Sequence, residues 1–284
     1  MKESISKNNI SSFDQHFKSY PTHKISRNAL TRSQINDIAM DWDAFRLLDH
    51  TYSNVIKNEM ETVTNQKSSG RCWGFAGLNL MRISLAEKYN LKNFEFSQNH
   101  FMFFDKLEKS NYFLENIIKT LNESYESRLM MHLLDSPVQD GGQWDMFVNL
   151  IEKYGIVPKT NMDDHFHSKN SEELKNFYNN FLRTAAHTIK TAKSSNLNSL
   201  KNELLSKCYK ILVLFLGEPP KKITWEYYKK GKKKDIYKTV EDITPLQFYK
   251  KFVPYNASDK ICLINYPCKS APFYKLYNID LAFN

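Results

Sequence analysis

The sequence predicts an α+β protein in which helices far outnumber strands. Segments with apolar residues at helical spacing recur between residues 72 and 252, and several of them follow good N-cap residues. Only two short segments, 223–228 and 260–265, have the apolar and aromatic runs that are typical of strands. With 284 residues, 41% of them hydrophobic and 25% charged, the chain has the size and composition of a folded protein of one large domain or two.

The N-terminal part is predicted to carry little regular structure. Residues 1–41 read as an extended polar arm with one or two short helical turns, for which 26–29 and 31–40 are weak candidates. Residues 42–60 suit a helix or a mixed segment without sharp periodicity, and the polar and small residues at 62–69 predict a loop. We therefore place a first boundary after residue 61.

The next segment, Cys72–Tyr89, is apolar on most faces, which predicts a buried helix. Gly74 and Gly77 each lower helix propensity by about 1 kcal/mol relative to alanine, so we expect that other backbone comes close to them. Further helices are predicted over 98–107 with Ser97 as N-cap, and over 111–122, 127–134 and 143–154. Residues 140–142 are predicted to form a turn, and Gly155 to end the last of these helices.

The second half is predicted to be an insertion that is mostly helical. Residues 160–170 look like a polar linker, and two long amphipathic helices follow over 171–194 and 197–216. A strand over 223–228, a lysine-rich hairpin tip and a short helix from Thr244 and Pro245 to Phe252 come next. Residues 260–265 are expected to form a buried strand.

Composition limits the compartment and the partners. The longest purely apolar run is residues 211–216, far shorter than the ~20 residues that span a bilayer, so no membrane association is expected. The first 15 residues lack the apolar core of a signal peptide, and the four cysteines form no CxxC pair, which together predict a reducing cytoplasm. The pairs Cys262 with Cys268 and His165 with His167 lack zinc spacing, so we expect no metal site there.

The chemistry concentrates at residues 66–76 (QKSSGRCWGFA). Cys72 would open a helix, where the helix dipole and unpaired N–H groups favour a thiolate, and Gly70 would allow a tight entry into that helix. The side-chain amide of Gln66 can reach the same point as the Cys72 backbone N–H, and two such donors form an oxyanion hole. The alternative for an arbitrary cysteine is a thiol packed in an apolar helix.

The whole string resembles the active-site signature of papain-like cysteine peptidases. Residues 64–73 (TNQKSSGRCW) are similar to the bleomycin hydrolase and aminopeptidase C branch of that superfamily. The similarity runs from about residue 12 to the last residue, through further strings in the order of the family. These strings lie at residues 95–98, 140–145, 152–155, 216–220, 225–227, 243–249 and 259–262.

The resemblance implies roles for matching positions. Cys72 would be the nucleophile, Gln66 would supply an oxyanion-hole amide, and the backbone of Gly141 and Gly142 would hold the substrate main chain, although an ordinary turn is the alternative for the pair. Trp73 and Trp144 suit core packing. The implied substrates are peptides with free N-termini, with homocysteine thiolactone or bleomycin-like amides as side activities, and the implied assembly is a homohexamer without cofactor.

The implied fold is the helical half of a papain-like domain at 62–160, after the arm and part of that domain at 1–61. A helical insertion or oligomerisation region follows at 161–258, and a truncated return to the papain-like domain at 259–284. Most of the β-barrel half would be missing. We expect this chain to be the N-terminal portion of a longer enzyme, a truncated inactive relative being the second explanation and an unusual active short form the third.

The positions of the histidines are the reason for expecting only the N-terminal portion of the enzyme. The catalytic histidine and asparagine of the family lie downstream of the matched region, and no histidine follows His187. His100, His132, His165 and His167 match no catalytic position of the family. Without a base the nucleophile–base unit is incomplete, so catalysis is expected to be lost in this chain by itself.

A basic cluster suggests a different class of function. The formal net charge is +9, which attracts anionic partners. Lysines beside Trp225, Tyr227 and Tyr228 could bind nucleic acid weakly, as part of a non-catalytic binding or structural protein, or could form a solvated hairpin tip. The cluster comprises Lys229, Lys230, Lys232, Lys233 and Lys234.

Overall fold

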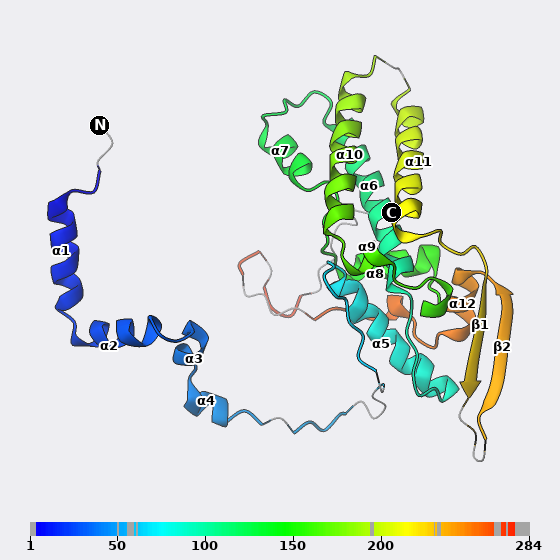
Figure 1. The fold of residues 1–284 in the computed structure, drawn as a ribbon, viewed down its shortest axis with the longest axis horizontal. Helices are drawn as coiled ribbons and strands as arrows, with labels where there is room; N and C mark the ends of the chain where they lie inside the picture. Colours follow the sequence, from blue (N-terminus) through cyan, green and yellow to red (C-terminus); the bar gives the residue numbers. More distant parts are fainter. Residues whose placement is uncertain are drawn as a thin grey trace. The chain divides into compact units, whose positions relative to one another are not determined.

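The computed structural model describes residues 4–49, 51–55, 60, 62–193, 196–229, 231, 234–263, 268–270 and 272–275. The chain divides into two compact units, Met1–Lys57 and Asn58–Asn284, and each is described by itself (Figure 1). Among the described residues, no helix combines the length and hydropathy that crossing a bilayer would require.

The described residues of the first unit form four helices with no buried residue in any of them: α1 (Lys7–Lys18), α2 (Pro21–Leu30), α3 (Ile35–Ala39) and α4 (Trp42–Arg46). Helix α1 was not predicted. It starts at a capping box in which Ser6 and Asn9 satisfy each other's backbone N–H groups, and it ends with His16 and Lys18 in its last turn. In the segment 42–60, for which a helix or a mixed segment was expected, the described residues are helical only in α4.

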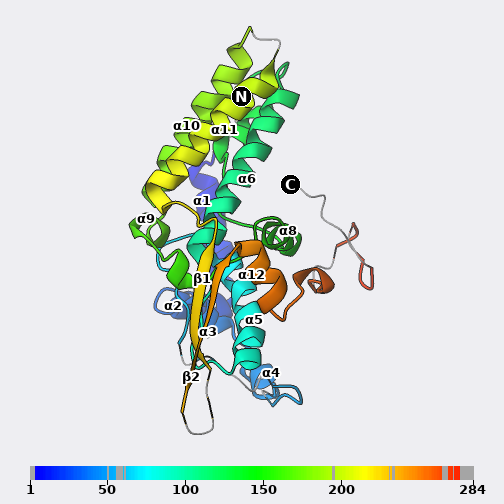
Figure 2. The same ribbon diagram turned by 90° about the vertical axis from the view of Figure 1, so that its right-hand side faces the viewer.

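The second unit is built around α5 (Cys72–Tyr89) and α6 (Gln98–Lys119). Helices α10 (Glu172–Thr191) and α11 (Leu197–Leu216) lie alongside α6 in Figures 1 and 2. Shorter helices complete the unit: α7 (Arg128–Asp135) and α8 (Trp144–Tyr154). The core is continuous across these helices, and each fully buried Leu, Ile, Phe or Met contributes about 1.5–3 kcal/mol. It includes Leu78, Met81, Leu85, Phe103, Leu114, Phe147, Leu182, Ile189 and Leu212.

The glycines of α5 face aromatic rings, whereas the sequence suggested a close approach of other backbone. A Cβ on Gly74 would stand 2.6 Å from the ring of Phe101 on α6, and a Cβ on Gly77 would stand 2.4 Å from the ring of Phe147 on α8. Since real Cβ contacts of that length do not occur, both glycines allow α5 to pack against its neighbours.

Helix α6 is continuous where the sequence suggested a break near residues 108–110. Ser110 lies inside the helix, fully buried. Its hydroxyl donates to the carbonyl of Lys106 at 2.7 Å and lies 2.8 Å from the hydroxyl of Tyr178 on α10. A partner from another helix therefore satisfies a side chain that by itself favours a helix end.

Residues 159–170 are packed structure, and the prediction of a polar linker was wrong. They contain the short helices η1 (Lys159–Asn161) and α9 (Phe166–Lys169), and Met162 and Ser168 are buried. Asn99 of α6 donates to the carbonyls of Asp163 and Leu216, at 2.9 and 2.8 Å.

A two-stranded antiparallel hairpin of β1 (Ile223–Lys229) and β2 (Ile236–Ile243) pairs Trp225 with Val240. The ring of Trp225 stacks on Tyr227 at 4.1 Å and meets Phe248 of α12 (Pro245–Phe252) edge-on at 5.1 Å. Gly155, at φ 70°, ends α8 against the start of α12, where a Cβ would stand 2.3 Å from the Leu246 nitrogen.

The predicted strand at 260–265 is absent from its described part. After η2 (Ala257–Asp259), residues 260–263 have no strand structure, and the side chains of Ile261 and Leu263 are exposed. Residues 264 and 265 lie outside the described residues. The α+β, mainly helical fold class is confirmed.

Candidate active site

Cys72 is the first residue of α5, and its side chain is exposed. Its thiol makes no hydrogen bond within the part of the chain that the structure describes. The helix behind it is held in the core by Phe75, Leu78 and Met81. A buried helix therefore carries an accessible sulfur at its N-terminus, where its unpaired N–H groups stabilise negative charge.

The loop before Cys72 positions Gln66. Lys67 adopts a left-handed backbone at φ 55°, with its N–H donating to Asn65 Oδ1 at 2.8 Å. The Ser69 hydroxyl donates to the Gln66 carbonyl at 2.6 Å and accepts from Arg71 Nε at 2.9 Å. In the described residues the Gln66 side-chain amide has no hydrogen-bond partner, and its Oε1 is buried. The amide is therefore uncommitted beside the turn into α5.

Arg71, the residue before Cys72, anchors this loop to a distant segment. Its guanidinium forms an ion pair with Asp164, and the two side chains are 4% and 5% exposed. Ser168 also donates to Asp164 Oδ1, at 3.1 Å, and the Ser171 N–H donates to the Ser68 carbonyl at 3.2 Å. The segment that the sequence suggested was a linker thus supports the loop of Gln66, a role that sequence reasoning missed.

The glycine pair lies beside the residue that follows Cys72. The indole N–H of Trp73 donates to the carbonyl of Asp140 at 2.9 Å, and a Cβ on Gly142 would stand 2.5 Å from the Trp73 ring. A Cβ on Gly141 would meet nothing. No hydrogen-bonded turn closes at residues 140–142 within the described chain, contrary to the predicted turn. There, the N–H and carbonyl of Gly142 have no hydrogen-bond partner, so both are open to a ligand backbone.

The tryptophans that were assigned to core packing also make polar contacts. Trp73 meets Phe101 edge-on at 4.9 Å, and Trp144 stacks on Phe147 at 5.2 Å. Trp144 Nε1 donates to the carbonyl of Lys260 at 3.2 Å. Both side chains are partly buried against the core.

No described histidine makes a hydrogen bond to Cys72. His100 is 2% exposed and meets Phe104 edge-on at 5.0 Å, and burial lowers the pKa of His100 to about 4, so it is a packed neutral residue. His187 lies 3.1 Å from the Tyr125 hydroxyl, and His165 would be 2.8 Å from a Cβ on Gly217. His132 lines the cavity beside the glycine pair.

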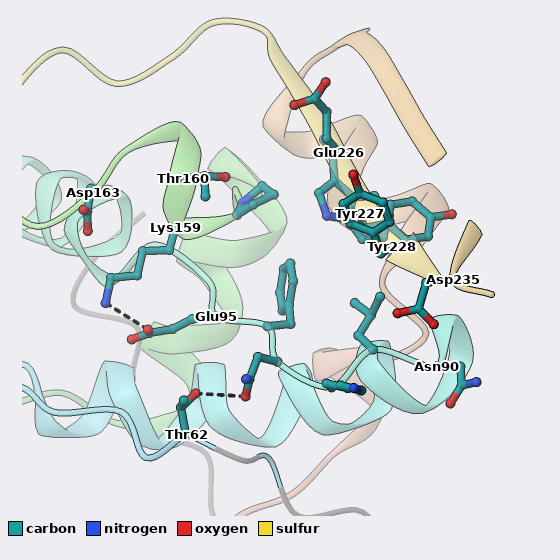
Figure 3. Close-up of a pocket in the computed structure, with 16 residues that line it drawn as sticks. Thr62, Asn90, Glu95, Lys159, Thr160, Asp163, Glu226, Tyr227, Tyr228 and Asp235 are labelled. Atoms are coloured by element: carbon teal, nitrogen blue, oxygen red, sulfur yellow. Dashed lines mark hydrogen bonds and ion pairs between the residues drawn. The ribbon is translucent and has the colours of Figure 1, made fainter. Parts of the chain in front are cut away.

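One cavity in the described part of the chain, of about 480 Å³, is bounded by Gly141 and Gly142 together with apolar side chains such as Leu129 and Met146. Another, of about 540 Å³, lies beside the C-terminal end of α5 (Figure 3). There Lys159 pairs with Glu95 at 2.8 Å, and the described lining holds no cysteine, histidine or serine. Cys72 lines neither cavity, and of the two only the first includes the glycine pair.

The other cysteines and candidate ligands are placed apart from this site. Cys208 is buried on α11, and burial raises the pKa of its thiol to about 11. Cys262 is exposed and Cys268 half-buried. Over the described ranges, no three His, Cys, Asp or Glu side chains gather to hold a metal ion. Of the basic cluster, Lys229 and Lys234 lie at the ends of the hairpin tip, and Lys230, Lys232 and Lys233 lie outside the described residues.

An accessible thiol at the start of a buried helix, with an uncommitted glutamine amide and open glycine backbone nearby, has the elements of the acylating half of a papain-like cysteine peptidase. A comparison with family models matches the Peptidase C1-like family over residues 4–284. The chain belongs to this family, and the predicted resemblance to papain-like cysteine peptidases of the bleomycin hydrolase and aminopeptidase C type is confirmed.

Individual relatives agree with that assignment. Aminopeptidase C of Listeria innocua is 47% identical over 82% of this chain and 53% of its own length. Bleomycin hydrolase of the mouse is 35% identical over 97% of this chain and 62% of its own length. A crystal structure of PepW from Lactobacillus rhamnosis superposes with a TM-score of 0.80 at 39% identity, covering 91% of this chain and 58% of that one. The chain spans between half and two thirds of the length of these relatives.

Proposed function

We propose that this chain carries the nucleophile half of a cysteine-type aminopeptidase of the bleomycin hydrolase type. The Cys72 sulfur attacks the carbonyl carbon of a peptide bond near a free N-terminus, and a C–S bond forms. The oxyanion accepts hydrogen bonds from the Gln66 amide and the Cys72 N–H, and the open N–H and carbonyl of Gly142 bind the substrate main chain. The amine leaves with a proton, and water then hydrolyses the thioester. The observation that supports this most is the exposed thiol at the start of α5, together with a Gln66 amide that has no hydrogen-bond partner in the described chain.

The proton transfers need a general base, and the described histidines do not supply one at Cys72. We propose that the catalytic histidine and its orienting asparagine come from residues outside these 284, in a papain-like half that the relatives have beyond the matched length. This chain by itself is then expected not to turn over a peptide substrate. Assembly as a homohexamer, a cytoplasmic location and peptide substrates belong to the same proposal, on the basis of family membership.

Gln66→Ala tests the oxyanion hole. A peptidyl chloromethyl ketone alkylates a thiol through a tetrahedral adduct, whereas chloroacetamide reacts by direct displacement and forms no oxyanion. Because one oxyanion donor is worth about 10²–10³-fold, the variant is expected to lower the rate of Cys72 labelling by the ketone about 100-fold. The rate with chloroacetamide is expected to stay unchanged. Both rates are measured by intact-mass spectrometry.

Gln15→Ala is the matched control, because Gln15 is an exposed glutamine outside the residues assigned to the site. It is expected to change neither rate. Equal labelling by the ketone in Gln66→Ala and in the unchanged chain would contradict the assigned role, as would an equal fall with both reagents.

Nucleic-acid binding at the hairpin is a second candidate. Tyr228 and Tyr237 are 65% and 48% exposed on neighbouring strands, with ring centroids 5.6 Å apart. Lys229 and Lys234 flank them. Exposed aromatic rings beside lysines can stack bases and neutralise phosphates, which supports this proposal.

Replacing the five lysines of the cluster with serine tests it. The variant is expected to bind single-stranded DNA more weakly and to reduce the salt slope by about one for each phosphate that it no longer neutralises. Fluorescence anisotropy between low and moderate salt measures both. The control removes five exposed lysines elsewhere, namely Lys24, Lys119, Lys207, Lys210 and Lys250. If DNA binding fell equally in the cluster variant and in the control variant, or did not fall in the cluster variant, the cluster would be only a solvated hairpin tip.

A further inference from the structure

Behind the glycine pair, helix α6 presents Asp105, Lys106 and Lys109, three of the four charged residues at positions 105–109. The side chain of Lys109 is only 4% exposed, and that of Asp105 is 6% exposed. Burial raises the pKa of the Asp105 carboxyl and lowers the pKa of the Lys109 ammonium, so each charge depends on the other. Burying such charges is costly unless every donor is satisfied.

The ammonium of Lys109 has three protons and three acceptors. It donates to Asp105 Oδ2 at 3.0 Å, to the Gln139 carbonyl at 2.9 Å and to the Gly141 carbonyl at 2.7 Å. It also lies 5.2 Å above the Trp73 ring. Two of its three hydrogen bonds therefore go to the backbone of the loop that contains the glycine pair.

Lys106, about one turn before Lys109 on α6, binds the same loop. It donates to the Gln139 carbonyl at 3.1 Å and to Asp140 Oδ1 at 2.8 Å. Lys175 of α10 pairs with the other carboxylate oxygen of Asp140 at 3.2 Å. Although desolvation acts against it, the two ammoniums hold the pKa of Asp140 below its usual value.

The loop is also joined to the nucleophile. The carbonyl of Asp140 accepts from Trp73, the residue after Cys72. A Cβ on Gly70 would stand 2.2 Å from the carboxyl carbon of Asp140. The carbonyls of residues 139, 140 and 141 are thus all occupied by donors from α6 or α5, whereas Gly142 has a free N–H and carbonyl in the described chain.

We propose that Lys106 and Lys109 are positioning residues for substrate binding. Their ammonium groups fix the carbonyls before Gly142 and so aim its free N–H and carbonyl at the main chain of a bound peptide, in register with Cys72. This rests on the proposed peptidase function. The lysines act through the loop, because their ammonium groups bind its carbonyls and the Asp140 carboxylate.

The test separates binding from reaction at Cys72. The saturation constant KI and the limiting rate kinact for a peptidyl chloromethyl ketone are measured on the full chain, with chloroacetamide as the reagent without a peptide. Asp105→Leu combined with Lys109→Met removes the buried pair together, so no lone charge is left inside. KI is expected to rise about tenfold, while the rate with chloroacetamide stays unchanged.

Lys106→Met is the second variant, because Lys175 still pairs with Asp140 and the fold is less at risk. It is expected to raise KI about threefold, and Lys106→Arg, which keeps a cationic donor, is expected to restore it. The matched control, Glu115→Leu with Lys201→Met, removes another ion pair between α6 and α11 and should leave KI unchanged.

The outcomes distinguish this inference from the proposed function. If the unchanged chain shows saturable labelling and neither lysine variant alters KI, the positioning role is wrong and the peptidase proposal stands. An equal rise of KI in the control variant would also overturn it, because removing any ion pair would then have the same effect. If the unchanged chain shows no saturation with the ketone, the proposed function fails and this inference fails with it.

Discussion

Cys72→Ala is expected to abolish rapid labelling of the protein by a peptidyl chloromethyl ketone. The thiol is the group assigned to attack the carbonyl carbon, and no other cysteine of the described chain is the first residue of a helix. Because its side chain is exposed and makes no hydrogen bond there, the free energy of unfolding should change by no more than about 0.5 kcal/mol. Labelling is followed by intact mass and stability by urea unfolding.

Cys262→Ala is the matched control, since Cys262 is also an exposed free thiol. It should leave the rapid labelling intact and remove only a slow second addition. Rapid labelling that survives in Cys72→Ala and disappears in Cys262→Ala would place the reactive thiol elsewhere.

Arg71→Met is expected to lower the free energy of unfolding by about 3–5 kcal/mol. The substitution leaves the carboxylate of Asp164, 5% exposed, without its buried counter-ion, and lone buried charges carry a penalty of that size. The urea midpoint should fall at an unchanged slope. Labelling of Cys72 by the peptidyl ketone should fall as well, because the Gln66 loop is no longer anchored to residues 164–168.

The double variant Arg71→Met with Asp164→Leu should recover most of that stability, because both charges are removed together. The comparison is Lys222→Met, which breaks an exposed pair with Asp242 and should cost no more than about 1 kcal/mol. If Arg71→Met lowered the free energy of unfolding by no more than Lys222→Met does, the buried ion pair would contribute no more to stability than a surface pair.

Helix ends with local signals were predictable from the sequence. The bounds of α5, α11 and α12 agree with the expected ones, since Gly217 ends α11 and Thr244 with Gln247 forms a capping box before α12. Helix α1 has such a box too, with Asn9 in the place of the usual Glu or Gln, and its polar sequence concealed it. These elements depend on residues a few positions apart.

Features that depend on distant partners were not predictable. Ser110 continues α6 because the Tyr178 hydroxyl, 68 residues away, is beside it. Residues 160–170 have the polar sequence of a linker, but one of their charged residues, Asp164, forms a buried ion pair with Arg71, 93 residues earlier. Residues 260–263 have an apolar sequence but no neighbouring strand in the described chain, so the apolar run alone did not make a strand.

The candidate site divides in the same way. The spacing of Gln66 and Cys72 was enough to predict that they share one site, because only six positions separate them in the sequence. The lysines of α6 that bind the glycine loop are separated from it by 30 to 34 residues, and no periodicity signals such a contact. Four charged residues fall at positions 105–109, at the end of the helix predicted over 98–107, and such a group would ordinarily be read as a solvated face.

The most direct test of the account compares two thiols in the unchanged chain. The ratio of labelling rates with a peptidyl chloromethyl ketone and with chloroacetamide is measured at Cys72 and at Cys262 by peptide mapping. Each ratio removes the intrinsic reactivity of its thiol. We expect the ratio at Cys72 to exceed that at Cys262 about 100-fold, equivalent to about 2.7 kcal/mol of peptide recognition. Equal ratios at the two cysteines would contradict the assignment of Cys72 as the nucleophile of a peptide-binding site.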